Sequence, residues 1–142
     1  GVQTIGDYAF SYCPRFESDL IIPNSVTTIG KYAFTECIGF DEDLKLPASI
    51  QEINEGAFSK CKRLTGKLHI PNAVKRISDS AFEGCAGFEG ILSIPDSVEY
   101  IGENAFAGCY RFDEELILPK GIKRINNGAF TGCKRLNGAL NM

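Results

Sequence analysis

The stretch IPDSVEYIGENAFAGC at residues 94–109 decides the fold, because residues 22–37 repeat its pattern as IPNSVTTIGKYAFTEC. The same pattern returns every 24 residues along the chain. Six cysteines mark the step most clearly: Cys13, Cys37, Cys61, Cys85, Cys109 and Cys133. A fixed period of this length is typical of a stacked array, in which each repeat buries its apolar face against its neighbours.

The repeats divide the 142 residues into a single array of six 24-residue turns, of which the last is three residues short. The turns span residues 2–25, 26–49, 50–73, 74–97, 98–121 and 122–142. Six turns exceed the minimum of about three that a stable array needs. Repeat arrays also need polar capping units at both ends, and the pattern shows none between Val2 and Met142. We therefore expect the chain to be a piece of a longer protein.

Each turn contains two segments with strand character and one with helical spacing. Residues 26–29 and their copies are expected to be extended, and residues 20–22 and their copies alternate like a strand that a proline then closes. Between them, spacings of three and four residues, as in Ala105, Phe106 and Cys109, predict a helix of about two turns. The predicted fold class is an α/β repeat solenoid with short parallel strands and short helices.

The cysteine spacing argues against both disulfides and zinc. Identical positions on stacked turns lie about 4.8 Å apart and point the same way, whereas a disulfide needs Cβ atoms roughly 3.5–4.5 Å apart with a twist. Zinc sites need close cysteine pairs, which the chain lacks. We predict a buried ladder of free thiols that act as small hydrophobes. A second ladder is predicted for the large apolar residues Phe16, Phe40, Leu64, Phe88, Phe112 and Leu136.

The strings at residues 22–37, 57–64 and 94–109 resemble the leucine-rich repeat family, in the BspA-like branch of bacterial surface proteins. The resemblance covers essentially the whole chain. It implies a right-handed leucine-rich-repeat superhelix in a secreted or cell-surface protein used for adhesion or host binding. It also implies a non-catalytic protein without a cofactor. The three residues at 65–67 lengthen the turn relative to commoner members of the branch. The resemblance therefore implies the fold of the array but not its curvature.

Bulk properties exclude several function classes. A net charge of -3 and a pI near 5.2 argue against a nucleic-acid ligand. No apolar run approaches the ~20 residues of a membrane span, so membrane insertion is not expected, and the chain shows no signal peptide. Its one histidine, His69, is expected on the surface while the thiols face inward. Without a nucleophile pair, we expect no enzyme activity.

One acidic bend is the only candidate for a metal, and no metal site is otherwise predicted. Glu17 and Asp19 would stack within about 5 Å of Asp41 and Asp43 on the next turn. Carboxylates held so close repel unless a cation or base joins them, and calcium takes oxygen ligands. The alternative is a solvated acidic edge whose negative charge is balanced by Lys45 or Arg15.

Two groups of residues are candidates for binding a protein or glycan partner. Residues 60–76 form a basic stretch without an acid, and Lys123 and Arg124 repeat its last two bases two turns later. Such a stretch can steer an anionic partner, although it can equally serve solubility. Tyrosines grouped on neighbouring turns suit protein or glycan contacts, or shield the surface beneath them. The candidates are Lys60, Lys62, Arg63, Lys67, His69, Lys75, Arg76, Tyr8, Tyr12 and Tyr32.

The sequence therefore favours a binding or adhesion module that displays variable outward residues on a rigid rod. The alternative is a passive structural spacer without a ligand of its own. Because strand ends are exposed at both ends of an uncapped array, end-to-end self-association is also expected.

Overall fold

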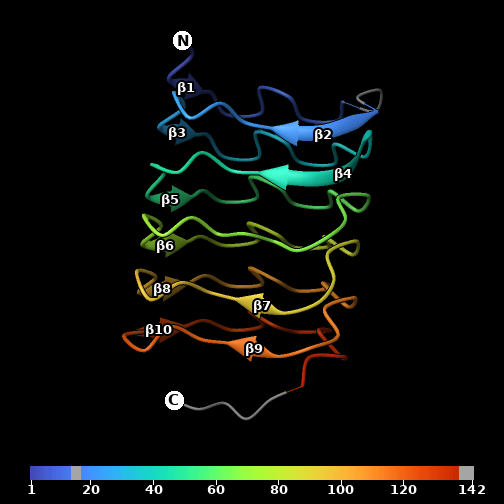
Figure 1. Ribbon diagram of the computed structural model, residues 1–142, viewed down its shortest axis with the longest axis vertical. Helices are drawn as coiled ribbons and strands as arrows, with labels where there is room; N and C mark the ends of the chain where they lie inside the picture. Colours follow the sequence, from blue (N-terminus) through green and yellow to red (C-terminus); the bar gives the residue numbers. More distant parts are fainter. Residues whose placement is uncertain (14–16, 138–142) are drawn as a thin grey trace.

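The computed structural model describes residues 1–13 and 17–137, which wind into a parallel β-solenoid of about five turns (Figure 1). One side of the rod carries six two-residue strands in two sheets. The first sheet pairs β1 (Thr4–Ile5) with β3 (Thr28–Ile29). The second contains β5 (Glu52–Ile53), β6 (Arg76–Ile77), β8 (Tyr100–Ile101) and β10 (Arg124–Ile125) in spatial order.

The opposite side of the rod carries the second strand of each turn. Here β2 (Ser18–Ile21) pairs with β4 (Phe40–Lys45), and β7 (Leu92–Ser93) pairs with β9 (Leu116–Ile117). All pairs are parallel, as predicted, because each strand meets its own copy on the next turn. The copy at residues 68–70 forms no strand, which separates the two sheets on this side.

The core consists of columns of identical residues that run along the rod. Alanine, phenylalanine, cysteine and isoleucine columns are almost wholly buried in the middle turns. The phenylalanine rings stack on one another, with centroids 5.6 Å apart between Phe58 and Phe82 and 5.4 Å apart between Phe82 and Phe106. The predicted second ladder is also buried at Phe40, Leu64, Phe88 and Phe112, whereas Phe16 and Arg15 lie outside the described residues.

The predicted helices were wrong: among residues 1–13 and 17–137, none is helical. Overlapping reverse turns replace them. Alternate main-chain N–H groups bond within the turn, such as Ala57 to Asn54 O, while those between them bond to the next turn, such as Phe58 to Ala81 O (2.9 Å). Hydrogen bonds to the neighbouring turn therefore replace the i to i−4 bonds that a helix requires.

Two positions in this segment have a left-handed backbone, which a helix cannot accommodate. The first holds Tyr8, Tyr32, Gly56, Ser80, Asn104 and Gly128, and the second holds Tyr12, Glu36, Lys60, Gly84, Gly108 and Gly132. Positive φ at the third residue is the mark of a type II turn. Glycine occupies the second position in three copies, where it adopts positive φ without a steric cost.

Acidic residues near the start of this segment bridge neighbouring turns. The Asp7 carboxylate accepts the N–H of Lys31, and the Asp79 carboxylate accepts the N–H of Glu103, each at 2.8 Å. The residue before each donor is glycine, and a Cβ there would lie about 2.5 Å from the aspartate. Gly102 is thus required both by the Asp79 side chain and by the main chain of Ser78 and Asp79, whose atoms would lie 2.5–2.6 Å from the Cβ.

Hydrogen bonds from the buried thiols reinforce the array. Cys61, Cys85 and Cys109 donate to the carbonyl oxygens of Phe34, Phe58 and Phe82 at 3.0, 3.0 and 3.1 Å. The described cysteines are all free. The predicted thiol ladder is confirmed for the middle turns, and the thiols also act as donors. In the part of the chain that the structure describes, no helix is long and apolar enough to cross a bilayer.

Candidate interaction surfaces

The predicted tyrosine cluster forms a platform on the reverse-turn face. The rings of Tyr8 and Tyr32 stack with centroids 5.3 Å apart, inclined by 11°. The Tyr32 hydroxyl donates to Glu55 Oε1 at 2.9 Å, and this hydrogen bond raises the pKa of the Tyr32 hydroxyl. A Cβ on Gly56 would lie 2.2 Å from the Tyr32 ring, so the ring covers this glycine closely. Tyr12, four residues after Tyr8, is also exposed, with 64% of its surface accessible.

The acidic bend is held together by main-chain donors and one base. Asp19 and Asp43 lie on the paired strands β2 and β4, and the Asp19 carboxylate accepts the Asp43 N–H at 3.0 Å. Asp41 pairs with Arg63 at 3.1 Å. A hydrogen bond to Asp19 and the charge of that residue raise the pKa of Glu42.

Glu17 is exposed at the start of this bend. Among residues 1–13 and 17–137, no group of three or more His, Cys, Asp or Glu side chains is arranged to hold a metal ion. Calcium binding is therefore not part of the function proposed below.

Three of the candidate bases are neutralised by acids from the preceding turn. Lys60 pairs with Glu36 at 3.2 Å, Arg63 with Asp41 at 3.1 Å, and Arg76 with Glu52 at 3.5 Å. In the described part of the chain, no carboxylate lies within 4.0 Å of the side-chain nitrogen of the other three, Lys62, Lys67 and Lys75.

The structure does not bring the basic stretch together, because 17 residues wrap most of the way around the rod. Lys60 and Lys62 line a groove of about 700 Å³ on the reverse-turn face. Lys67 and His69 line a hollow of about 350 Å³ on the side of the second strands. Lys75 and Arg76 lie at the sheet of β5, β6, β8 and β10.

A cysteine–histidine nucleophile does not form among the described residues. His69 is exposed, whereas Cys61 and Cys85 are wholly buried. Burial raises the pKa of Cys37 to about 11 and those of Cys61, Cys85 and Cys109 further. These thiols are therefore protonated and inert at neutral pH.

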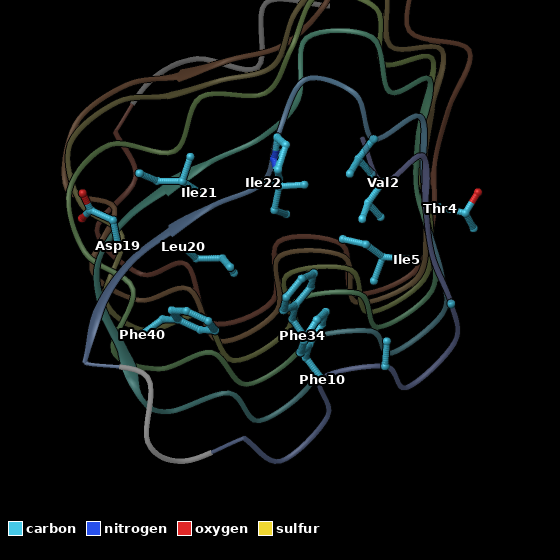
Figure 2. A pocket seen from close by; sticks show the side chains of 14 residues that line it. Val2, Thr4, Ile5, Phe10, Asp19, Leu20, Ile21, Ile22, Phe34 and Phe40 are labelled. Atoms are coloured by element: carbon cyan, nitrogen blue, oxygen red, sulfur yellow. The ribbon is translucent and has the colours of Figure 1, made fainter.

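The first turn leaves the core open. A cavity of about 500 Å³ lies at this end, and Figure 2 shows Ile5, Phe10, Leu20 and Ile22 pointing into it while Thr4 points away. Phe10 remains 39% exposed, although its ring stacks on Phe34. The end-to-end association expected from the sequence stays a prediction.

One grouping was found only in part by reasoning along the chain. Arg76, Tyr100 and Arg124 occupy matching positions on β6, β8 and β10, and the Arg76 guanidinium lies 3.8 Å from the centre of the Tyr100 ring. The repeat step of 24 residues related Arg124 to Arg76 in the sequence, and the same step would have placed Tyr100 between them.

Parallel strands stacked on a repeated apolar core define a leucine-rich-repeat solenoid. Sequence comparison matches residues 3–137 to six copies of a family described as "BspA type Leucine rich repeat region". The chain belongs to this BspA-type leucine-rich repeat family, which confirms the resemblance noted in its sequence. No curated protein matches the chain.

Solved structures support the same assignment. A leucine-rich repeat protein of T. pallidum is 32% identical, with a TM-score of 0.83 over 95% of this chain and 61% of that one. A leucine-rich cell surface protein of Faecalibacterium prausnitzii is 35% identical, with a TM-score of 0.73 over 85% and 30%. A leucine-rich repeat protein of Bacteroides ovatus is 29% identical, with a TM-score of 0.61 over 84% and 38%. The chain thus spans less than two thirds of each of these proteins.

Proposed function

We propose that this chain is a non-catalytic binding or adhesion module of a bacterial surface protein, which takes a protein or glycan ligand. The observation that carries the proposal is the platform formed by Tyr8 and Tyr32. Its two rings are stacked and one hydroxyl is fixed on Glu55, yet 57% of the Tyr8 surface is accessible. Rigid aromatic side chains with a polar tip are enriched in interfaces, because they lose little entropy on binding.

The remaining outward residues support the same proposal. The core columns repeat almost unchanged, whereas large apolar side chains are exposed only at particular turns. The surface of the rod therefore differs from turn to turn, although its exposed apolar groups are scattered singly and do not by themselves mark a contact site. They include Tyr12, Ile21, Ile38, Tyr110 and Ile117.

Surface location also belongs to the proposal. The matching family is BspA-type, and one of the similar structures is that of a leucine-rich cell surface protein. We infer that this chain is displayed outside the cell, where an exposed aromatic platform can meet a ligand.

A passive spacer is the second candidate. Six ion pairs join neighbouring turns among the described residues, including Lys31 with Glu55 and Lys123 with Glu99. Such pairs neutralise charge along the rod, and each contributes about 0–1 kcal/mol at the surface. A spacer would need nothing more.

A binding screen separates the two candidates. The purified chain is tested for saturable binding to immobilised extracellular-matrix proteins and to neutral and acidic glycans. Its Tyr8→Asn/Tyr12→Asn variant is compared with Tyr110→Asn, which removes an exposed tyrosine elsewhere. Asparagine tolerates the positive φ at Tyr8 and Tyr12, as Asn104 already does at the position equivalent to Tyr8.

The proposal predicts a saturable ligand that the double variant loses and the Tyr110 variant keeps. Absence of saturable binding across the panel would favour the spacer. Equal losses in both variants would show that the platform is not the binding surface.

A further inference from the structure

A basic stripe lies on the flat face of the sheet formed by β5, β6, β8 and β10. Lys75 and Arg76 come from β6 and the residue before it, and Lys123 and Arg124 come from β10 and the residue before it. Strand β8 separates the two pairs. With about 4.8 Å between strands, the pairs lie about 10 Å apart along the rod.

The net charge of this face is positive, whereas that of the chain as a whole is negative. Between residues 51 and 124, its outward positions hold four bases and two acids, Glu52 and Glu99, in a chain whose net charge is -3. The equivalent outward positions on the first two turns are uncharged: Gln3, Thr4, Thr27 and Thr28. The excess positive charge is thus confined to one stretch of this face.

Two of the four bases have no internal partner. Glu52 pairs with Arg76 at 3.5 Å and Glu99 with Lys123 at 3.2 Å. Neither Lys75 nor Arg124 has a carboxylate within 4.0 Å among the described residues, and both side chains are exposed. An anionic ligand can therefore bind Lys75 and Arg124 without breaking an ion pair within the chain.

The aromatic ring between the pairs orients one of these bases. Arg76 lies 3.8 Å from the centre of the Tyr100 ring, and stacking on an aromatic face restricts a guanidinium. A guanidinium held in one place loses less entropy when it binds a carboxylate or sulfate. The half-buried Tyr100 acts here as a positioning residue.

We propose that this face, which we call the basic stripe, binds a linear acidic polysaccharide lying along the rod. The proposal rests on the function proposed above and adds a second surface, distinct from the platform of Tyr8 and Tyr32, together with the ligand class it takes. The main-chain groups that face one another between β6, β8 and β10 are engaged in the ladder, as in the bond from Glu99 N–H to Lys75 O (2.9 Å), and among the described residues only the edge strands β5 and β10 lack a neighbouring strand of this sheet on one side. An extended peptide could therefore not add as a strand on this face, and only side chains remain for recognition.

Charge spacing supports the same occupant. A polymer that crosses three strands meets bases at both ends of a span of about 10 Å, with neutral and paired groups between them. A polysaccharide carries its sulfate or carboxylate groups at regular intervals on the chain itself. Arginine and lysine side chains bind such groups through charge-assisted hydrogen bonds.

Paired charge variants test the proposal. Binding of the whole chain to heparin, polygalacturonate, polyglutamate and neutral dextran is measured by surface plasmon resonance. Lys75→Gln/Arg124→Gln removes two unpaired bases from the stripe. Lys62→Gln/Lys67→Gln removes the same charge from unpaired bases on other faces. All four side chains are exposed, so thermal unfolding is expected to be unchanged in both variants.

The proposal predicts saturable binding to heparin, polygalacturonate or both, and heparin alone would identify sulfate as the preferred group. Loss of Lys75 and Arg124 should weaken this binding about tenfold or more, and loss of Lys62 and Lys67 less than about twofold. Equal weakening in both variants, or equally tight binding to polyglutamate, would overturn it. Binding to a neutral protein or glycan, with none to these acidic polysaccharides, would overturn only this inference and leave the binding module intact.

Discussion

The thiol of Cys85 donates a hydrogen bond to the carbonyl oxygen of Phe58, 27 residues earlier in the chain, at 3.0 Å. The same oxygen accepts the N–H of Cys61 from within its own turn at 3.2 Å. Each phenylalanine carbonyl in the middle of the array is thus shared between a turn and its successor. Cysteine is suited to this position because it is small, apolar and a weak donor.

Substitution of Cys85 should show how much the array depends on this column. Cys85→Asp places a carboxylate in a wholly buried site without a partner, so we expect the array to lose cooperative folding. Cys85→Ala loses one hydrogen bond and leaves a small cavity, at a cost of about 1–2 kcal/mol in the free energy of unfolding. Urea denaturation followed by circular dichroism measures both.

The same change at the partly exposed Cys133 serves as a control, because its environment collapses more easily. Cys133→Ala should cost less than Cys85→Ala. A folded and soluble Cys85→Asp variant with unchanged stability would show that the thiol column is not buried.

Stability should fall at alkaline pH because of the buried thiols. Burial raises the pKa of Cys37 to about 11, from 9.0, and raises those of Cys61, Cys85 and Cys109 further. The unfolded chain therefore releases these protons first. The thiols' contribution to stability is complete below pH 9 and is lost as the pH rises through 11 and above.

Each thiol that stays protonated in the folded state should lower the free energy of unfolding by about 1.4 kcal/mol per pH unit in this range. Urea midpoints at about pH 8 and about pH 10 give the slope. All other ionisable groups are common to the wild type and Cys85→Ala, so the difference between the two slopes isolates the Cys85 thiol. A slope for Cys85→Ala that is no shallower than that of the wild type would contradict burial of the Cys85 thiol.

The phenylalanine stack should be most sensitive in its middle. Phe82 is wholly buried, with Phe58 and Phe106 on its two faces. Phe82→Ala is expected to cost about 3–5 kcal/mol, because a buried ring leaves a large cavity. Phe10→Ala removes the same group at the open end and should cost about 1 kcal/mol. Similar losses in unfolding free energy at the two sites would argue against an open first turn.

Two glycines with similar backbones should respond differently to alanine. Gly56 and Gly108 both have positive φ, at 59° and 76°, so alanine strains each backbone by about 1–2 kcal/mol. At Gly108 the new Cβ meets only ordinary contacts at 3.6 Å, whereas at Gly56 it would lie 2.2 Å from Tyr32 Cδ1. Gly56→Ala should therefore cost about 1 kcal/mol more, because it displaces the ring hydrogen-bonded to Glu55.

Chemical denaturation of the two alanine variants, each alone and in a Tyr32→Ala background, measures this difference. In the Tyr32→Ala background, most of the extra loss of stability caused by Gly56→Ala should disappear. The loss caused by Gly108→Ala should stay the same. Equal costs in the wild-type background would mean that the Tyr32 ring does not lie over Gly56.

The repeat alone allowed the array, its parallel strands and its buried columns to be predicted, because each copy must solve the same packing problem. It misled at the reverse-turn segment, where the spacing of Ala105, Phe106 and Cys109 also fits one face of a helix. Hydrogen bonds to the next turn decide the conformation there. The recurrent glycines, such as Gly84 and Gly132, were the sequence signal for positive φ in place of a helix.

The candidate surfaces were harder to predict because residues close in sequence wrap around the rod. Lys60 and Arg76 belong to one stretch but lie on different faces, and each is paired with an acid from the turn before. Residues 24 or 48 apart are the true neighbours, as in Arg76, Tyr100 and Arg124. The surfaces of this fold are thus formed by the repeat columns and not by stretches of sequence.

The most direct test of a binding role is a saturation isotherm of the intact chain on matrix proteins and on neutral and acidic glycans, at low and at high salt. We predict at least one saturable ligand, lost when either the platform of Tyr8 and Tyr32 or the basic stripe is altered while the fold is kept. Binding at the basic stripe should also weaken with salt. No saturable binding to any member of the panel at either salt concentration would contradict the binding module and favour the spacer.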